Sequence, residues 1–302
     1  MSDDDYRGRF APSPTGPLHF GSLVAALGSY LDARAYGGQW LLRMEDLDRT
    51  REVRGAADDI LRTLDSFGFE WDGPVVYQSR RSDAYQALLE RLLDGGLAFP
   101  CGCSRKQVAA AGRPGPEGPV YPGTCRNGPK HSFKPRSFRV RTDGAEIAFE
   151  DRIQGLHRQS LEQELGDFVI RRADGLFAYQ LAVVADDAWQ GVNQVVRGAD
   201  LLLSTPRQLH LQRLLELPRP NYAHLPLAVD ASGRKLSKQD RDLPILRRAP
   251  LEALVAAYRF LGQTPPAEGL GSTREFWTWA NANWDPARVP ARTQAPLPSA
   301  PG

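Results

Sequence analysis

One stretch near the start of the chain has the composition of a nucleotide-binding turn. Residues 9–22 are punctuated by prolines and glycines, and they contain His19 and Gly21 directly before an apolar segment. Leu23, Leu27 and Leu31 continue it at helical spacing, which predicts a strand end, a tight turn and a helix start. Such a turn offers phosphates the partial positive charge of a helix N-terminus. An ordinary β-turn-α connection explains the same residues equally well.

A second stretch far downstream has the residues to stabilise phosphate charge. It is a small basic loop at residues 233–239, and it supplies Lys235, Ser237 and Lys238. A lysine on a flexible loop acts as a mobile point charge where negative charge develops in a transition state. For an isolated loop of this kind, a solvated basic turn is the simpler interpretation.

The two stretches together resemble the paired signatures of class I aminoacyl-tRNA synthetases. Residues 9–22 look like the opening of a glutamyl-tRNA synthetase, and residues 183–187 and 195–202 also match that family. The resemblance extends over roughly residues 7 to 245. It implies an α/β fold with a Rossmann-like parallel-sheet catalytic domain. It also implies catalytic roles for His19 and Lys238, and an ATP site formed by His19, Gly21, Ser22, Lys235, Ser237 and Lys238. Leu236 and Gln239 depart from the family's usual methionine and serine, so we expect altered loop dynamics with activation retained.

The amino-acid pocket is expected to match the charges of glutamate. Arginine guanidinium groups can grip carboxylates bidentately, which suits Arg9 and Arg197. Glu45 follows a predicted strand and suits the substrate ammonium, while Tyr179 offers a hydroxyl. The resemblance assigns the substrate site to Arg9, Phe10, Ala11, Pro12, Ser13, Glu45, Tyr179 and Arg197. Without it, these residues would more often be surface ion pairs or core packing.

The cysteines indicate a structural metal site. All three of them, Cys101, Cys103 and Cys125, fall in one short window, and an odd number argues against disulfides. Zinc needs a fourth ligand for a closed tetrahedral site. The family resemblance favours Tyr121, whereas His131 is the more ordinary ligand chemically. Three thiols without a metal are the alternative interpretation.

A run of cations follows the last cysteine. It allows two interpretations of similar weight, contact with an RNA phosphate backbone or a solvated surface. Its members are Arg126, Lys130, Lys134, Arg136, Arg139 and Arg141.

The elements that position these residues follow from the hydrophobic pattern. Strands are predicted at 6–11 and 39–43, and helices at 22–36, 56–67 and 83–93, which is the alternation of a parallel sheet. The rhythm breaks into short antiparallel runs between 98 and 172, which predicts an α+β insert. The expected organisation is 1–97 and 173–245 as halves of the catalytic domain, 98–172 as a zinc-containing insert resembling an acceptor-binding domain, 246–285 as a helical segment resembling a stem-contact region, and 286–302 as a disordered tail.

Composition is that of an ordinary globular protein. The chain has 302 residues, 41% hydrophobic and 25% charged, with a net charge of +2. No apolar run approaches a membrane span, and the acidic first residues are unlike a signal peptide. We therefore expect a cytoplasmic protein without a membrane partner, and a monomer.

The length points to a particular branch of the resembling family. Only about sixty residues follow Lys238, so the large helical anticodon-binding region of a full glutamyl-tRNA synthetase is expected to be missing. Family members with that pattern activate L-glutamate with ATP and Mg²⁺ and attach it to the queuosine base in the anticodon of tRNA(Asp). The alternatives are a truncated enzyme that charges a tRNA 3′ end and a non-catalytic RNA-binding paralogue.

Overall fold

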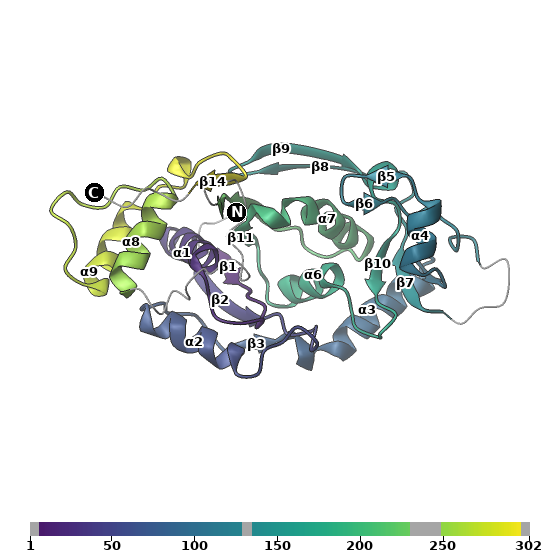
Figure 1. Ribbon diagram of the computed structural model, residues 1–302, viewed down its shortest axis with the longest axis horizontal. Coiled ribbons are helices and arrows are strands. Elements are labelled where there is room, and N and C mark those ends of the chain that lie inside the picture. Colours follow the sequence, from purple (N-terminus) through teal and green to yellow (C-terminus); the bar gives the residue numbers. More distant parts are fainter. Residues whose placement is uncertain (1–5, 129–134, 230–248, 297–302) are drawn as a thin grey trace.

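The computed structural model describes residues 6–128, 135–229 and 249–296. Figure 1 shows an elongated molecule, with the parallel strands and the C-terminal helices in one half and an antiparallel insert at the other end. The lysine loop with Lys235, Ser237 and Lys238, and the alternative ligand His131, lie outside the described residues.

The centre of the catalytic half is a parallel sheet, as predicted. Strands β1 (Arg7–Phe10), β2 (Gln39–Met44) and β3 (Val76–Tyr77) pair in parallel. Strands β11 (Gln194–Gly198) and β12 (Asn221–Leu225) do the same. The N–H of Asn193 donates to the carbonyl of Arg7 at 3.1 Å, so β1 and β11 lie edge to edge. The carboxyl ends of β1 and β11 therefore meet on one side of the sheet.

Helix α1 (Phe20–Ala35) is the helix predicted at 22–36, and it begins two residues earlier and ends one residue earlier. His19 is its N-cap, in an extended conformation with φ −116° and ψ 175°. At the other end Gly37 has φ +63°, and the N–H of Gly38 donates to the carbonyl of Ala33 at 2.9 Å. This is a Schellman motif, and it turns the chain directly into β2.

The C-terminal helices share the hydrophobic core of the catalytic sheet. Helix α8 (Pro250–Phe260) packs close to α1, and α9 (Thr273–Asn283) lies beside it (Figure 1). A Cβ on Gly28 would lie 2.6 Å from Cδ1 of Leu225, so a larger residue would displace that side chain at the contact between α1 and β12. Trp277 stacks edge-on against Tyr30 and donates its indole N–H to the carbonyl of Phe67 at 2.9 Å. Trp277 is therefore a packing residue.

The insert contains the antiparallel sheet that its sequence indicates. Strands β4 (Ala98–Cys101) and β10 (Phe168–Arg171) flank β7 (Ser137–Val140). A short helix, α4 (Arg105–Ala111), starts at Ser104 with a capping box that uses Gln107. The cysteines lie at the end of β4 and in the loop beyond α4.

The predicted insert boundaries need a correction, because part of residues 98–172 belongs to the catalytic sheet. Strands β8 (Glu146–Asp151) and β9 (Gly155–Ser160) form a hairpin. Asp151 at its tip pairs in parallel with Tyr222 of β12. Figure 1 shows the hairpin running along the molecule from the insert to the catalytic half. Alternating exposed and buried residues of β8 explain why sequence pattern alone assigned it to a separate antiparallel unit.

The expectation of a disordered tail from residue 286 is wrong for residues 286–296. A 3₁₀ turn, η5 (Pro286–Arg288), is followed by β14 (Gln294–Pro296), which pairs in parallel with β13 (Leu227–Val229). Ala295 is buried opposite Ala228. A strand of three residues among prolines is too short to show a hydrophobic period in the sequence. It is ordered by its pairing with β13.

A second core lies between the sheet and the insert, and it includes residues of α3 (Ser82–Asp94), α5 (Leu161–Glu164), α6 (Tyr179–Trp189), η3 (Ala199–Ser204) and α7 (Thr205–Leu214). Helix α2 (Ala56–Ser66) packs into the core of the catalytic sheet instead. The remaining short elements are η2 (Gln78–Arg80), β5 (Pro114–Gly115) and β6 (Gly118–Pro119). Among the described residues, no helix is long and apolar enough to cross a bilayer.

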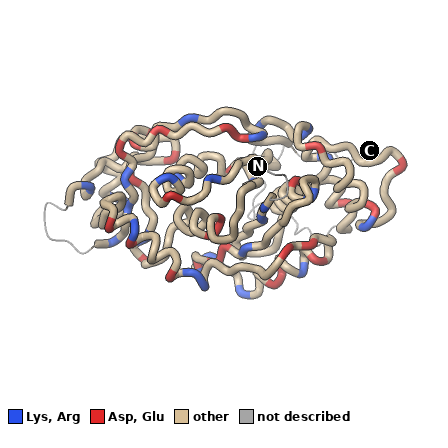
Figure 2. Tube along the Cα trace, turned by 180° about the vertical axis from the view of Figure 1, so that it is seen from behind, with Lys and Arg blue, Asp and Glu red and all other residues tan. Residues whose placement is uncertain are grey.

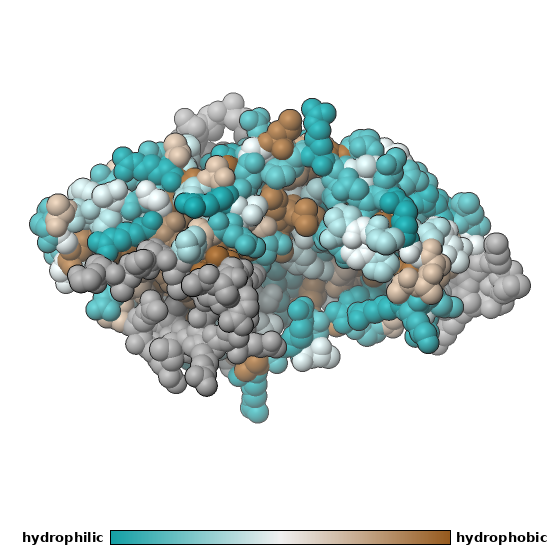
Figure 3. Space-filling model, turned by 45° about the horizontal axis from the view of Figure 1, so that its top comes forward, coloured by the Kyte–Doolittle hydropathy of each residue, from teal (hydrophilic) through white to brown (hydrophobic). Residues whose placement is uncertain are grey.

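The charges are mixed over the whole molecule. Figure 2 shows acidic and basic residues interspersed along the chain, in keeping with the small net charge. Figure 3 shows hydrophobic side chains gathered near the middle of one face, with hydrophilic side chains over most of the rest.

Candidate active site

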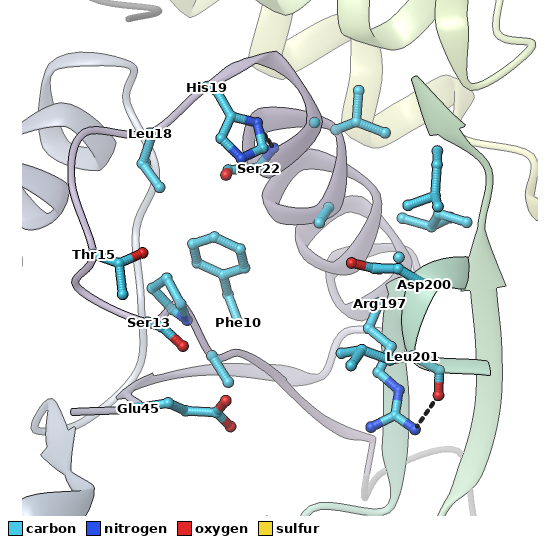
Figure 4. Close-up of a pocket in the computed structure, with 18 of the residues that line it drawn as sticks. Phe10, Ser13, Thr15, Leu18, His19, Ser22, Glu45, Arg197, Asp200 and Leu201 are labelled. Atoms are coloured by element: carbon cyan, nitrogen blue, oxygen red, sulfur yellow. Dashed lines mark hydrogen bonds between the residues drawn. The ribbon is translucent and has the colours of Figure 1, made fainter. Parts of the chain in front are cut away.

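A cavity of about 500 Å³ opens at the carboxyl ends of β1 and β11, beside the start of α1. Figure 4 shows the loop of residues 13–19 and the first turn of α1 above it, with Glu45 and Arg197 on opposite sides of its floor. Ligands of open parallel α/β sheets bind at this edge. The cavity is lined by all of the predicted glutamate residues, Arg9, Phe10, Ala11, Pro12, Ser13, Glu45, Tyr179 and Arg197, and by His19, Gly21 and Ser22 of the predicted ATP site.

The first turn of α1 is built around His19. Its Nδ1 accepts the backbone N–H of Ser22 at 3.4 Å, so the proton of the neutral ring is on Nε2. A Cβ on Gly21 would lie 3.3 Å from the ring, which leaves little room for a larger residue. This arrangement combines a histidine N–H with the partial positive charge of the helix start.

Arg197 is a buried cation held by several acceptors. Its Nε donates to Nε2 of His224 at 3.0 Å, and its Nη2 donates to the hydroxyl of Thr205 at 2.9 Å. Its Nη1 lies 3.4 Å from the hydroxyl of Tyr179, at the cavity wall. The guanidinium is thereby fixed in direction toward the cavity.

The sequence predicted that the guanidinium of Arg9 binds a substrate carboxylate bidentately, but in the structure it pairs with a carboxylate of the protein. Its Nε and Nη2 both donate to the carboxylate of Asp187, at 3.1 and 3.4 Å. This edge of the guanidinium is therefore occupied by the protein itself. The Nη1 end is the part of Arg9 that can serve a ligand.

Arg43 is a buried cation behind the cavity that sequence reasoning missed. It is fully buried in β2 and contacts Asp187 at 2.8 Å, Glu45 at 3.5 Å and Asp186 at 4.0 Å. Asp186 and Asp187 hold arginines behind the cavity. An arginine within a run of apolar strand residues was the available signal, because burial of such a charge requires partners.

Glu45 lies at the cavity wall with Arg43 behind it. Its side chain is only 10% exposed, and its Oε1 is buried 3.5 Å from Nη2 of Arg43 without hydrogen-bond geometry to any described residue, so Oε2 is the oxygen that can serve a ligand. Burial raises the pKa of Glu45, and the opposing positive charges of Arg43 and Arg9 limit the shift. A buried carboxylate without a hydrogen bond favours a bound ammonium. Burial also raises the pKa of the Tyr179 hydroxyl, which therefore stays protonated as a donor.

The three cysteines converge in the insert. Their Sγ atoms all lie within 4.8 Å of one another, and those of Cys103 and Cys125 are 3.6 Å apart. The hydroxyl of Tyr121 lies 3.5 Å from Sγ of Cys101 and 3.9 Å from that of Cys103. Sulfur ligands about 2.3 Å from a tetrahedral zinc are themselves roughly 3.8 Å apart, so this donor set fits such an ion.

The surroundings of Cys103 disfavour its thiolate form. Burial and the neighbouring thiols raise the pKa of Cys103 to about 11. The guanidinium of Arg139 lies 4.0 Å from the Tyr121 ring centre, and its Nε is 3.4 Å from Sγ of Cys101. Binding of a divalent cation would stabilise all three thiolates at once.

Half of the cations after the last cysteine neither form a solvated surface nor are free to contact RNA, because they are engaged within the protein. Arg126 forms a bidentate pair with Asp167, with both contacts at 2.8 Å, and also reaches Asp143. Arg139 packs on Tyr121, and Arg141 donates to the carbonyl of Arg126 at 2.7 Å. These side chains hold the insert together, Arg136 is exposed, and Lys130 and Lys134 lie outside the described residues.

Comparisons with known proteins agree with this fold. The model of the family "tRNA synthetases class I (E and Q), catalytic domain" matches residues 5–269. A crystal structure of the glutamate–tRNA ligase from Elizabethkingia meningosepticum, in complex with its amino acid, has a TM-score of 0.78 and 25% identity, covering 97% of this chain and 67% of that one. The glutamate–tRNA synthetase of Elizabethkingia anophelis has a TM-score of 0.79 at 25% identity, covering 98% and 68% of the two chains. Fold and site thus define a class I tRNA synthetase catalytic domain.

Other relatives match over nearly their whole length. The glutamyl-Q tRNA(Asp) synthetase of Dechloromonas aromatica is 58% identical over 97% of this chain and 99% of its own. That of Chromobacterium violaceum is 59% identical over 96% and 97% of the two chains. The chain belongs to the glutamyl-Q tRNA(Asp) synthetase family.

Proposed function

We propose that this protein activates L-glutamate with ATP and transfers it to the queuosine base in the anticodon of tRNA(Asp). The observation that carries the proposal is the cavity in which Arg197 and Glu45 face each other beside the start of α1. A cation and an anion on opposite walls complement a zwitterionic amino acid, and the helix start adjoins them as a phosphate site.

In the first step, an oxygen of the glutamate α-carboxylate attacks the α-phosphorus of ATP and pyrophosphate leaves. The product is glutamyl-adenylate. No general base is needed, because the carboxylate is already ionised, so alignment and stabilisation of phosphate charge supply the catalysis. Mg²⁺ bound to the phosphates neutralises part of that charge.

Residue roles follow from the cavity. Arg197 and the Nη1 end of Arg9 bind the carboxylates of glutamate, the Tyr179 hydroxyl donates to one of them, and Glu45 binds the ammonium. Phe10, Ala11, Pro12 and Ser13 form the adjoining wall. Glutamine lacks the second charge, and we expect it to lose about 2–5 kcal/mol of binding where a desolvated guanidinium is left under-paired.

The ATP site combines the α1 turn with the lysine loop. His19 donates from Nε2 to a phosphate oxygen, while Gly21 and Ser22 keep the backbone accessible. Lys238 is proposed as the mobile charge on the leaving phosphates, with Lys235 and Ser237 as further donors. His19 and Lys238 are the proposed catalytic residues.

In the second step, a hydroxyl oxygen of the queuosine cyclopentenediol attacks the activated carbonyl carbon. AMP leaves, the hydroxyl proton is released, and an ester forms. The family relatives named for this activity support this acceptor over a tRNA 3′ end.

The experiment supplies ATP, labelled glutamate and tRNA(Asp) with or without queuosine. We expect label only on queuosine-containing tRNA, in the anticodon fragment after nuclease digestion. Label on the 3′-terminal adenosine would favour a 3′-charging enzyme. Absence of glutamate-dependent pyrophosphate exchange would favour the RNA-binding paralogue and overturn the activation step.

We also propose that Cys101, Cys103, Cys125 and Tyr121 hold a structural Zn²⁺. The convergence of three thiols and a phenol supports this ion and leaves no position for a substrate. The expectation that the protein is monomeric remains a prediction, which light scattering tests.

A further inference from the structure

A line of three buried polar groups leads away from the cavity floor. The carboxylate of Asp151 accepts a hydrogen bond from Nδ1 of His224 at 2.5 Å, and Nε2 of His224 accepts from Nε of Arg197 at 3.0 Å. All three residues are at most 5% exposed. They come from β8, β12 and β11, so the line crosses neighbouring strands of one sheet.

Backbone hydrogen bonds fix the orientation of the Asp151 carboxylate. Its Oδ1 accepts three backbone N–H groups, from Ile153 at 3.0 Å, Gln154 at 2.9 Å and His224 at 3.1 Å. These bonds close the tip of the β8–β9 hairpin and prevent the carboxylate from rotating. Oδ2 can therefore only point at the imidazole.

This contact decides which ring nitrogen of His224 carries the proton. A carboxylate accepts, so Nδ1 must be the N–H and Nε2 must be the lone pair. Burial lowers the pKa of His224 to about 4, which keeps the ring neutral near pH 7. Tyr222 lies parallel to the ring, with centroids 6.2 Å apart and planes 7° apart, and limits its tilt.

The lone pair in turn sets the direction of Arg197. Nε is held by His224 and Nη2 by Thr205 and the carbonyl of Leu201, the latter at 3.4 Å. Nη1 is then left at the cavity beside Tyr179. A guanidinium held at two nitrogens cannot turn away when the cavity is empty, so less ordering remains for ligand binding.

We propose that Asp151 and His224 are positioning residues for Arg197: Asp151 selects the Nδ1–H tautomer of His224, whose Nε2 aims the arginine at the glutamate carboxylate. The assignment of the ligand rests on the proposed function. The hairpin that supplies Asp151 thereby connects the insert to the amino-acid site.

The decisive variant is Asp151→Asn. Asparagine keeps Oδ1 for the three backbone N–H groups but places an NH₂ group opposite Nδ1, which forces the proton onto Nε2. Two donors, Nε2–H and Nε–H, then face each other between His224 and Arg197. We expect the KM for glutamate in pyrophosphate exchange to rise about 10- to 100-fold, as for loss of a hydrogen bond to a charged group, with the KM for ATP unchanged.

The tautomer is observed directly by ¹⁵N NMR of the imidazoles, which is practical because the chain has five histidines. We expect Nδ1–H for His224 in the wild-type protein and Nε2–H in the Asp151→Asn variant. A ring that keeps Nδ1–H in the variant would overturn the role of Asp151.

Two substitutions of His224 provide the rescue test. Glutamine places its amide near the Nε2 position and can offer an oxygen to Arg197, whereas asparagine reaches only the Nδ1 position. We expect His224→Gln to bind glutamate more tightly than His224→Asn. Equal glutamate KM values for both and for the wild type would overturn the proposal.

A matched control separates positioning from stability. Asp167→Asn removes another fully buried carboxylate, one that pairs with Arg126 in the insert and makes no hydrogen bond to Arg197 among the described residues. We expect it to lower the unfolding midpoint without changing the KM for glutamate. If the wild-type protein shows no exchange, the proposed function fails, while the NMR result still decides whether Asp151 sets the tautomer.

Discussion

At the scale of single residues, the site places uncompensated charge where a ligand must supply the partner. Arg9 and Arg43 share Asp187, and Arg197 is surrounded by neutral acceptors. Arg197 therefore lacks a carboxylate partner among its described hydrogen bonds. A buried guanidinium in that state favours an anionic ligand, because a carboxylate stabilises it more than neutral oxygens do.

Replacing Glu45 by glutamine tests the ammonium site. The change preserves shape and removes the negative charge, so we expect the KM for glutamate to rise by at least about tenfold, as for loss of a charged hydrogen bond. The exchange assay measures it. An unchanged KM for glutamate would contradict the role of Glu45, and the KM for ATP serves as the internal control.

The pKa of Glu45 adds a pH test. Because burial raises it, the carboxylate becomes protonated at a higher pH than an ordinary glutamate would. Only the ionised form binds an ammonium, so wild-type affinity for glutamate should fall as pH is lowered from 7 toward 5. The Glu45→Gln variant should be weak and flat over that range. Parallel profiles of the two proteins would contradict the assignment.

His224 predicts a pH dependence of stability. Its folded pKa of about 4 lies below that of an unfolded histidine, about 6.5, so the unfolded state binds more protons between these values. The neutral His224 therefore contributes to the free energy of unfolding above pH 6.5, and this contribution is lost as the pH falls through 4. Urea unfolding at pH 7 and 4.5 should show the wild-type free energy falling by about 2 kcal/mol more than that of His224→Gln. His210, which is common to both proteins, cancels in the difference.

At the scale of elements, the hydrophobic pattern predicted the strands and helices of the catalytic sheet, because such a pattern depends only on residues close together in the sequence. The start of α1 and the apolar strands β1 and β2 have signals of this local kind. What pattern missed depends on pairs distant in sequence. Arg43 and Asp187 become neighbours only when the chain folds, and so do Asp151 and His224. Arg126 likewise points into the insert because it pairs there with Asp167.

The proposed metal site has two candidate fourth ligands, which paired variants separate. Tyr121→Phe keeps the ring that packs near Phe99 and removes only the hydroxyl, whereas His131→Ala removes the alternative. We expect the first to weaken zinc binding about 10-fold or more and the second to have no effect. Competition with a chromophoric chelator measures the affinity. The reverse order would assign the site to His131.

At the scale of the whole molecule, distant segments close the active-site cavity. Leu227 and Ala228 of β13 line it, and β14 is the partner that holds β13 in place. The hairpin tip is tied in as well, since Gln154 donates to the carbonyls of His224 at 2.7 Å and Arg292 at 3.1 Å. The C-terminal segment, which composition indicated as a disordered tail, thus reaches the ligand site through one strand.

This arrangement predicts that the C-terminal segment supports nucleotide binding. Truncation after residue 290 removes β14 and the Arg292 carbonyl, so β13 loses its ladder partner and the cavity wall loosens. We expect the KM for ATP in exchange to rise several-fold and the unfolding midpoint to fall. The matched control ends after residue 296, which keeps β14 and should retain both values. If the shorter protein also kept both, β14 would not support the site, and the contribution of β13 would come from its contacts with the sheet alone.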